Sequence, residues 1–141
     1  MLYRDMMKSK AIALLTIFLF ANVIAACASE PTQPDPPFPT FVYDSALSLK
    51  SYRLAIRMPE MLNKLPCYCD CGRASGHTSL NSCFFKADGS YNDHASGCEV
   101  CGLEMVDAAQ WAQEGKSLKQ IRTMIDSKYA PYGMPTNTAL P

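Results

Sequence analysis

The sequence predicts an all-α fold: a small three- to four-helix bundle with a long Cys/His-bearing loop, stapled by metal or disulfides. Apolar residues recur at helical spacing on both sides of this loop. Six of the seven cysteines lie within residues 67–101, inside or beside the loop. A domain covering residues 41–135 buries only one modest core, so disulfides or a metal ion are expected to add stability.

Residues 1–26 resemble the signal peptide of a bacterial lipoprotein. A basic start precedes the apolar residues 11–20, and small residues lead to Cys27. The resemblance implies cleavage after Ala26, a diacylglycerol and palmitate-type lipid on the Cys27 sulfur, and a cell-membrane anchor on the extracytoplasmic face. A plain transmembrane anchor is the alternative, but the apolar run is shorter than the ~20 residues that span a bilayer.

Residues 27–40 are expected to form a lipidated, proline-rich tether. Five prolines between Ser29 and Thr40, without apolar periodicity, favour an extended and semi-rigid chain. The whole chain has 13 basic and 13 acidic residues, and loss of residues 1–26 removes three basic residues and one acidic residue. The mature protein is then mildly acidic and has no basic stripe, which argues against nucleic acid as a partner.

The cysteine-rich helical domain, residues 41–135, is expected to open with a helix near Asp44 or Ser45. Either side chain can accept a hydrogen bond from the free N–H groups of the first turn. Apolar residues between positions 47 and 56 supply a buried face. Pro59 interrupts this pattern and is tolerated in a first helical turn, so we expect a broken helix whose second part is short.

Residues 72–97 are rich in Gly, Ser, Asn and Asp and contain His77, Cys83 and His94. The composition predicts a loop with little secondary structure. A loop of this length is unusual in a small domain unless crosslinks or a bound ion order it. Aromatic side chains are expected to anchor it against the helices: Phe84, Phe85 and Tyr91.

Two further helices are expected to form a hairpin. The first runs from Gly97 or Cys98 to Gln113, is apolar around much of its circumference, and ends at Gly115 with positive φ. Ser117 caps the second, and its buried face is formed by Leu118, Ile121, Ile125 and Tyr129. Residues 136–141 are expected to be an irregular tail.

The motif Pro66-Cys67-Tyr68-Cys69-Asp70-Cys71 places three cysteines at alternate positions. Alternate residues of an extended chain point to the same side, so the three sulfur atoms can converge on one centre. Cys98 and Cys101 form a C-x-x-C pair at the start of a helix, where free N–H groups and the helix dipole favour a thiolate. Together with Cys83, these residues indicate a shared centre.

Three structural disulfides are the main alternative, because the domain is expected outside the cytoplasm. Bridges within the row of Cys67, Cys69 and Cys71 would be strained, so they would cross to Cys83, Cys98 and Cys101. A redox-active pair at Cys98 and Cys101 is the third possibility. Three cysteines on one side of a strand suit convergent metal ligation better than a disulfide scaffold.

Ligand softness indicates which metal the centre would bind. Thiolates and imidazoles suit Cu(I) or Zn(II), whereas Mg²⁺ and Ca²⁺ prefer oxygen ligands that are not clustered here. Methionines at helical positions are more often core residues, and Asp70 is interpreted as a turn residue. The predicted metal ligands are Cys67, Cys69, Cys71, Cys83, Cys98 and Cys101, with His77 and His94 as secondary candidates.

These residues resemble the bacterial lipoproteins named for a Pro-Cys-Tyr-Cys-Gly-Cys motif. The likeness rests on residues 66–71 and on the spaced residues that follow them: His77, Cys83-Phe84, His94-x-x-x-Cys98-x-x-Cys101, Gly115-Lys116-Ser117, Ile121-Arg122 and Asp126-x-x-Tyr129. Asp70 replaces the motif's glycine, and it must adopt a less favourable conformation if the family's backbone needs glycine there. The resemblance implies an exported, cysteine-rich, metal-binding domain and carries over no reaction.

The end of the domain is similar to the three-helix thiol-reductase domain of cytochrome c maturation. This likeness rests on Cys98-x-x-Cys101, on residues 114–117, and on the second helix, which ends at residues 128–133. It implies that Cys98 and Cys101 form a redox pair acting on apocytochrome thiols. The row of three cysteines and the histidine-bearing loop have no counterpart in that family.

The sequence therefore favours a non-enzymatic, membrane-tethered domain that binds Cu(I) or Zn(II) for metal storage, delivery or sensing. Its contact with the membrane is the lipid on Cys27, and its metal-delivery or redox partner protein is not identified. The alternatives are a thiol-disulfide oxidoreductase that uses Cys98 and Cys101, and a disulfide-stapled interaction module.

Overall fold

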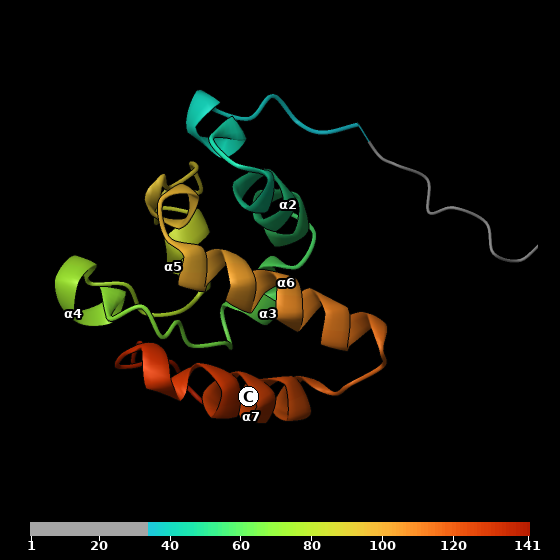
Figure 1. Cartoon of the computed structure of the whole chain (residues 1–141), viewed down its shortest axis with the longest axis vertical. Helices are drawn as coiled ribbons and strands as arrows, with labels where there is room; N and C mark the ends of the chain where they lie inside the picture. Colours follow the sequence, from blue (N-terminus) through green and yellow to red (C-terminus); the bar gives the residue numbers. More distant parts are fainter. Residues whose placement is uncertain (1–33) are drawn as a thin grey trace, which may run out of the picture. The chain divides into compact units, whose positions relative to one another are not determined.

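Three helices of ten or more residues form the frame of the computed structural model, which describes residues 34–141 (Figure 1). They are α2 (Ala46–Ala55), α6 (Glu99–Gln113) and α7 (Leu118–Tyr129). Shorter α-helices lie between α2 and α6: α3 (Pro59–Leu62), α4 (Cys71–Ser75) and α5 (Asn81–Phe84). The remaining turns are the 3-10 helices η1 (Thr40–Tyr43), η2 (His94–Ser96) and η3 (Ala130–Tyr132).

The all-α prediction is confirmed. Within residues 34–141 no strand forms, and the one β-bridge pairs Phe85 with Tyr91. No helix in this part of the chain is long and apolar enough to cross a membrane. The expected signal peptide, the lipidated Cys27 and half of the tether, residues 27–33, lie outside the described residues.

Helix α2 begins at the expected cap and breaks where the proline predicts. The Ser45 side chain accepts a hydrogen bond from the N–H of Ser48 at 2.9 Å. The helix ends at Ala55, and Pro59 opens α3 in its first turn. The buried residues of α2 are Ser48, Ser51, Tyr52 and Ala55. Two of them are serines, so the buried face of this helix is less apolar than the sequence predicted.

Helix α6 is the central helix, packed against α2 and α7 (Figure 1). The contact with α2 depends on Gly102, because a Cβ atom there would lie 2.9 Å from Cγ of Leu47. Met105, Ala108 and Ala109 are buried, as expected for a central helix. Leu103 is the exception, since it faces solvent.

The turn from α6 to α7 matches the sequence prediction. Gly115 has φ +78°, a conformation that favours glycine. The Ser117 side chain accepts from the Gln120 N–H, and the Gln120 side chain accepts from the Ser117 N–H, which completes a capping box. Ile121, Ile125 and Tyr129 are buried as predicted, whereas Leu118, which was also predicted to be buried, is half-buried.

The loop of residues 72–97 contains more secondary structure than we expected. The end of α4, α5 and η2 lie within it, so the prediction of a largely structureless loop was wrong. The predicted aromatic anchors are confirmed: the Phe84 ring contacts Tyr52 of α2 with centroids 5.0 Å apart, and Tyr91 contacts both Tyr52 and Phe85. Packing of these rings on α2 orders the short helices.

The C-terminal tail has no helix after Tyr132, as expected, but it is not detached. Thr136 is buried, and the Thr138 hydroxyl donates a hydrogen bond to the Thr78 carbonyl at 2.7 Å. At the other end of the domain, Phe38 is buried in the core. The packed unit therefore extends slightly beyond residues 41–135 at both ends.

Candidate metal centre

The row of three cysteines converges, but only partly through strand alternation. Cys67 and Cys69 lie in irregular chain between α3 and α4, with their sulfur atoms 3.4 Å apart. Cys71 is instead the first residue of α4. Its Sγ lies 3.7 Å from Sγ of Cys83, on α5.

Asp70 provides the turn that redirects Cys71. Its backbone has φ 63° and ψ 9°, the left-handed conformation, and it is the one non-glycine residue with positive φ among residues 34–141. This confirms that Asp70 adopts a conformation normally given to glycine. The expectation of one continuous extended row was wrong at this residue, because a left-handed residue ends the alternation.

The C-x-x-C pair lies at the N-terminus of α6, as predicted. Cys98 is the N-cap residue, and Cys101 lies in the first turn. The Cys101 sulfur is 3.3 Å from that of Cys67 and 3.5 Å from that of Cys69. The start of the central helix therefore faces the first two cysteines of the row.

Both histidines lie beside the sulfur atoms. His94 Nε2 is 3.5 Å from Sγ of Cys69, and His77 Nδ1 is 3.5 Å from Sγ of Cys83. The two imidazole rings meet edge to face, with centroids 4.6 Å apart. Their placement in the cysteine-bearing loop brings them to the centre that the sequence suggested.

Seven of the eight predicted ligands form three overlapping sets of four. Within each set the donor atoms all lie within 4.8 Å of one another: Cys67, Cys69, Cys83 and Cys101; Cys69, His94, Cys98 and Cys101; Cys69, Cys71, Cys83 and His94. His77 belongs to none of the sets and contacts the centre through Cys83. We call these eight residues the cysteine cluster.

The spacing of the sulfur atoms fits a soft metal ion. The six cysteines of residues 34–141 are free, and the contacts between their sulfur atoms measure 3.3–3.7 Å. A disulfide needs about 2.05 Å. A tetrahedron of sulfur atoms about 2.3 Å from a central zinc ion has edges of about 3.8 Å. Thiolate and imidazole donors are also the ligands that Cu(I) and Zn(II) prefer.

The Cys69 sulfur accepts hydrogen bonds from two neighbouring thiols of the cluster. Hydrogen bonds from Cys101 and Cys67 lower the pKa of the Cys69 thiol. The pKa of Cys101 is raised, because its proton is shared with Cys67 and Cys69 and because it is buried. The contacts within the cluster therefore favour a thiolate at Cys69.

Glu104 is a buried acid that the sequence analysis missed. Its side chain has no exposed surface; Oε1 accepts a hydrogen bond from the Tyr68 N–H at 2.9 Å, and Oε2 has no partner. Burial raises the pKa of this carboxyl to about 8. Glu104 follows Cys101 by three positions, so the two side chains lie on one face of α6. This spacing is the sequence signal that could have identified Glu104.

Asn92 is a second missed residue, and it positions both histidines. Its Nδ2 donates to the Ser82 carbonyl at 2.8 Å and lies 3.4 Å from His77 Nε2. Its Oδ1 accepts the backbone N–H of His94 at 3.2 Å. The sequence signal is an Asx turn, with asparagine two residues before the histidine.

Bonds to α7 hold the backbone of the row. The Tyr68 hydroxyl donates to Asp126 at 2.8 Å, and Asp126 is paired with Arg122 at 3.0 Å. Arg122 also donates to the Thr138 carbonyl at 3.3 Å. The residue between the first two cysteines is thus tied to α7 and to the tail.

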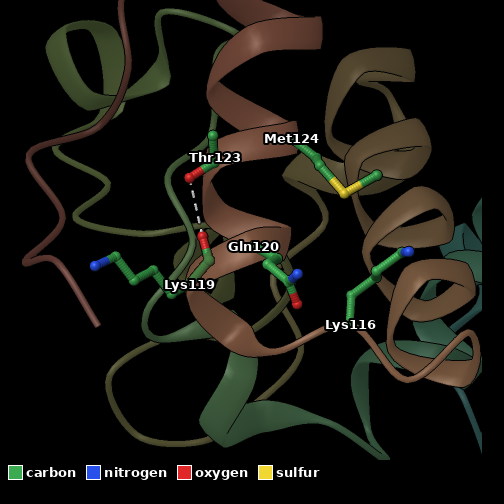
Figure 2. A pocket seen from close by; sticks show the side chains of 5 residues that line it. All are labelled: Lys116, Lys119, Gln120, Thr123 and Met124. Atoms are coloured by element: carbon green, nitrogen blue, oxygen red, sulfur yellow. Dashed lines mark hydrogen bonds between the residues drawn. The ribbon is translucent and has the colours of Figure 1, made fainter.

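A surface pocket on α7 lies apart from this chemistry (Figure 2). It is lined by residues of α7 and the turn before it: Lys116, Lys119, Gln120, Thr123 and Met124. The dashed line in Figure 2 is the hydrogen bond from the Thr123 hydroxyl to the Lys119 carbonyl. None of the lining residues is a cysteine or a histidine, so the pocket is not part of the candidate centre.

Residues 18–141 match the family model described as "Protein of unknown function with PCYCGC motif". The match includes every residue of the cysteine cluster. No curated protein and no solved structure matches the chain.

Proposed function

The chain belongs to the PCYCGC-motif family, and from this premise we propose that it is a lipoprotein whose cysteine cluster binds a soft metal ion. The proposed ion is Cu(I) or Zn(II), and the proposed role is metal storage, delivery or sensing on the extracytoplasmic face of the cell membrane. The lipid on Cys27 is the proposed anchor, as the lipoprotein-like signal implies.

The observation that carries this proposal is the convergence of six free thiols and His94 in three overlapping sets, within each of which the donor atoms lie within 4.8 Å of one another. Cys67, Cys83 and Cys101 have no exposed surface, and Cys71 is 1% exposed. A small domain that encloses so many unpaired sulfur donors has little reason to place them together unless they bind something. Soft cations are the ligands that such donors bind best.

The number of donors favours binding over catalysis. Catalytic zinc sites typically have three protein ligands and leave one position open for water or substrate. Here a fourth donor lies within 4.8 Å of the others in each set. The cluster can therefore saturate an ion with protein ligands, as a storage or delivery site requires.

Three donors offer a route by which an ion enters and leaves. Cys69, His94 and Cys98 are half-buried, whereas the other cysteines of the cluster are buried. A partner thiolate can approach the ion from this side and exchange with one of these donors. Binding displaces protons from the thiols, so metal affinity is expected to rise with pH until they are deprotonated.

A redox role for Cys98 and Cys101 has weaker support. The proximity of Cys101 lowers the pKa of the Cys98 thiol, but the Cys69 sulfur and burial outweigh this effect, so the pKa is raised. A nucleophilic thiol of an oxidoreductase needs the opposite shift. A redox pair at Cys98 and Cys101 also leaves the other four free thiols of the cluster without a role, so we do not propose thiol-disulfide exchange as the function.

The test is the metal content of the full chain isolated anaerobically in detergent. We expect stoichiometric copper or zinc, and cluster thiols that react with an alkylating reagent only after a chelator is added. Six thiols already oxidised in three disulfides, without metal, would overturn the proposal.

Two cysteine variants separate the cluster from the anchor. Cys69→Ser is expected to lose metal and stay with the membrane. Cys27→Ser, the matched control, is expected to keep the metal and leave the membrane. Metal loss in Cys27→Ser alone would contradict the assignment of both residues.

A further inference from the structure

The cysteine cluster has more donors than one ion uses. Zinc in a structural site takes four ligands. The three sets together contain seven donors, six thiols and one imidazole. A single ion would leave three of them without a metal bond in the interior of the domain.

The donors divide into two groups, which we call the two ends of the cluster. Cys98 belongs only to the set with Cys69, His94 and Cys101, whereas Cys71 belongs only to the set with Cys69, Cys83 and His94. No set within residues 34–141 contains both Cys98 and Cys71. One ion therefore does not serve the start of α6 and the start of α4 together.

Cys69 is common to all three sets. Its Sγ accepts hydrogen bonds from Cys67 at 3.4 Å and from Cys101 at 3.5 Å. A thiolate sulfur has several lone pairs and can bind two ions at once, whereas one imidazole nitrogen has a single lone pair. Of the two residues shared by both ends, Cys69 is therefore the one that can bridge and His94 is not.

The charge of the cluster also favours a second cation. No lysine or arginine is buried in the described part of the chain, so the cluster has no buried cation beside it. Six thiolates carry six negative charges, of which one divalent ion offsets two. Buried charge without a partner is costly, so a second ion stabilises the deprotonated cluster.

We infer that the cluster takes two soft metal ions, one bound by Cys98 and Cys101 and one by Cys71 and Cys83, with the Cys69 thiolate bridging them. This inference rests on the proposed function and adds the number of ions and the roles of the donors. Each end has one further donor nearby: Cys67 lies 3.3 Å from Cys101, and His94 lies 3.5 Å from Cys69.

The test uses Cd(II) as the probe metal and the full chain in detergent, reduced and free of oxygen. Cys27→Ser is the background, so that only cluster thiols are present. Native mass spectrometry is expected to show two Cd(II) ions per chain. Cadmium NMR is expected to show two resonances split by scalar coupling through a shared sulfur.

Variants assign the ions to the two ends. Cys98→Ser and Cys71→Ser are each expected to lower the stoichiometry from two ions to one. Cys69→Ser removes the donor that all three sets share and is expected to release both ions, and the cadmium–cadmium coupling with them. Met124→Leu removes a sulfur atom from the α7 pocket instead and is expected to keep two coupled ions.

Saturation at one Cd(II), or two ions without coupling, would overturn the bridged pair and leave the proposed metal-binding function intact. No Cd(II) bound at all would overturn both. If Cys69→Ser does not fold, as judged by circular dichroism, the cadmium–cadmium coupling in the Cys27→Ser chain decides whether the two ions share a sulfur atom.

Discussion

Cys67 and Thr136 exchange two hydrogen bonds although they are 69 positions apart in the chain. The Cys67 N–H donates to Oγ1 of Thr136, and the Thr136 N–H donates to the Cys67 carbonyl, both at 2.9 Å. Thr136 is buried, so neither pair is easily replaced by water. The tail thus fixes the backbone of the first cysteine in the cluster.

Thr136→Val is expected to destabilise the domain. Valine keeps the shape of threonine but leaves the buried Cys67 N–H without its acceptor, which costs about 1–3 kcal/mol. We expect a lower free energy of unfolding in denaturant and faster loss of metal to a chelator. Thr136→Ser retains the hydroxyl and is the control; equal stability of Thr136→Val and Thr136→Ser would contradict this role.

Asp70→Gly is expected to stabilise the domain by about 1 kcal/mol. A left-handed conformation costs a residue with a Cβ atom about 1–2 kcal/mol and costs glycine little. The variant loses the ion pair with Arg73, but this pair is exposed and exposed pairs contribute little.

Asp70→Ala is the matched control for this position, because it keeps the Cβ atom and also loses the ion pair. It is expected to be less stable than Asp70→Gly in the same denaturant titration. If glycine gives no gain over alanine, the left-handed backbone of Asp70 is not a source of strain.

The helices followed from the sequence because their signals are local. The caps at Ser45 and Ser117, the break at Pro59 and the positive φ of Gly115 were all predicted and are all observed. Each depends on the chemistry of a few neighbouring residues. Short helices such as α4 and α5 were missed because four or five residues give no hydrophobic period.

The membership of the cluster also followed from the sequence, but its geometry did not. Cysteine and histidine spacing singled out eight residues, of which seven lie in the three donor sets and His77 lies beside them. The left-handed turn at Asp70 and the bond to Thr136 depend on contacts between distant parts of the chain. Glu104 was hidden within an apolar helix, where a charged residue is normally expected to face solvent.

His94→Ala is expected to weaken metal binding more than His77→Ala. His94 belongs to two of the three donor sets, whereas His77 belongs to none and contacts Cys83 from outside them. Loss of an outer neighbour typically costs about 10- to 100-fold in metal affinity, and loss of a direct ligand costs more. Competition with a chromophoric chelator measures the metal affinity of both variants. A larger loss of affinity in His77→Ala would contradict the prediction and indicate that His77, not His94, is the direct ligand.

Glu104 is expected to make the stability of the metal-free, reduced domain depend on pH. Its pKa is raised from 4.5 to about 8, chiefly by burial, so the folded state holds a proton that the unfolded state releases over this range. Stability therefore falls as the pH rises from about 4.5 to 8, with each pKa unit equivalent to about 1.4 kcal/mol.

Glu104→Gln is expected to remove this contribution. The difference in unfolding free energy between the variant and the unmodified chain should be small near pH 4.5, widen up to about pH 8 and then level off. Glu114→Gln, an exposed change at the end of the same helix, is the control. A difference that does not vary with pH would show that Glu104 is not held protonated.

X-ray absorption at the metal edge of the anaerobically isolated full chain tests the central claim most directly. The account predicts a first shell dominated by sulfur at about 2.3 Å, the zinc–sulfur distance, with a minor nitrogen contribution from imidazole. This shell should disappear in Cys69→Ser and persist in Cys27→Ser. A first shell of oxygen or nitrogen without sulfur, or a chain that retains no metal, would contradict it.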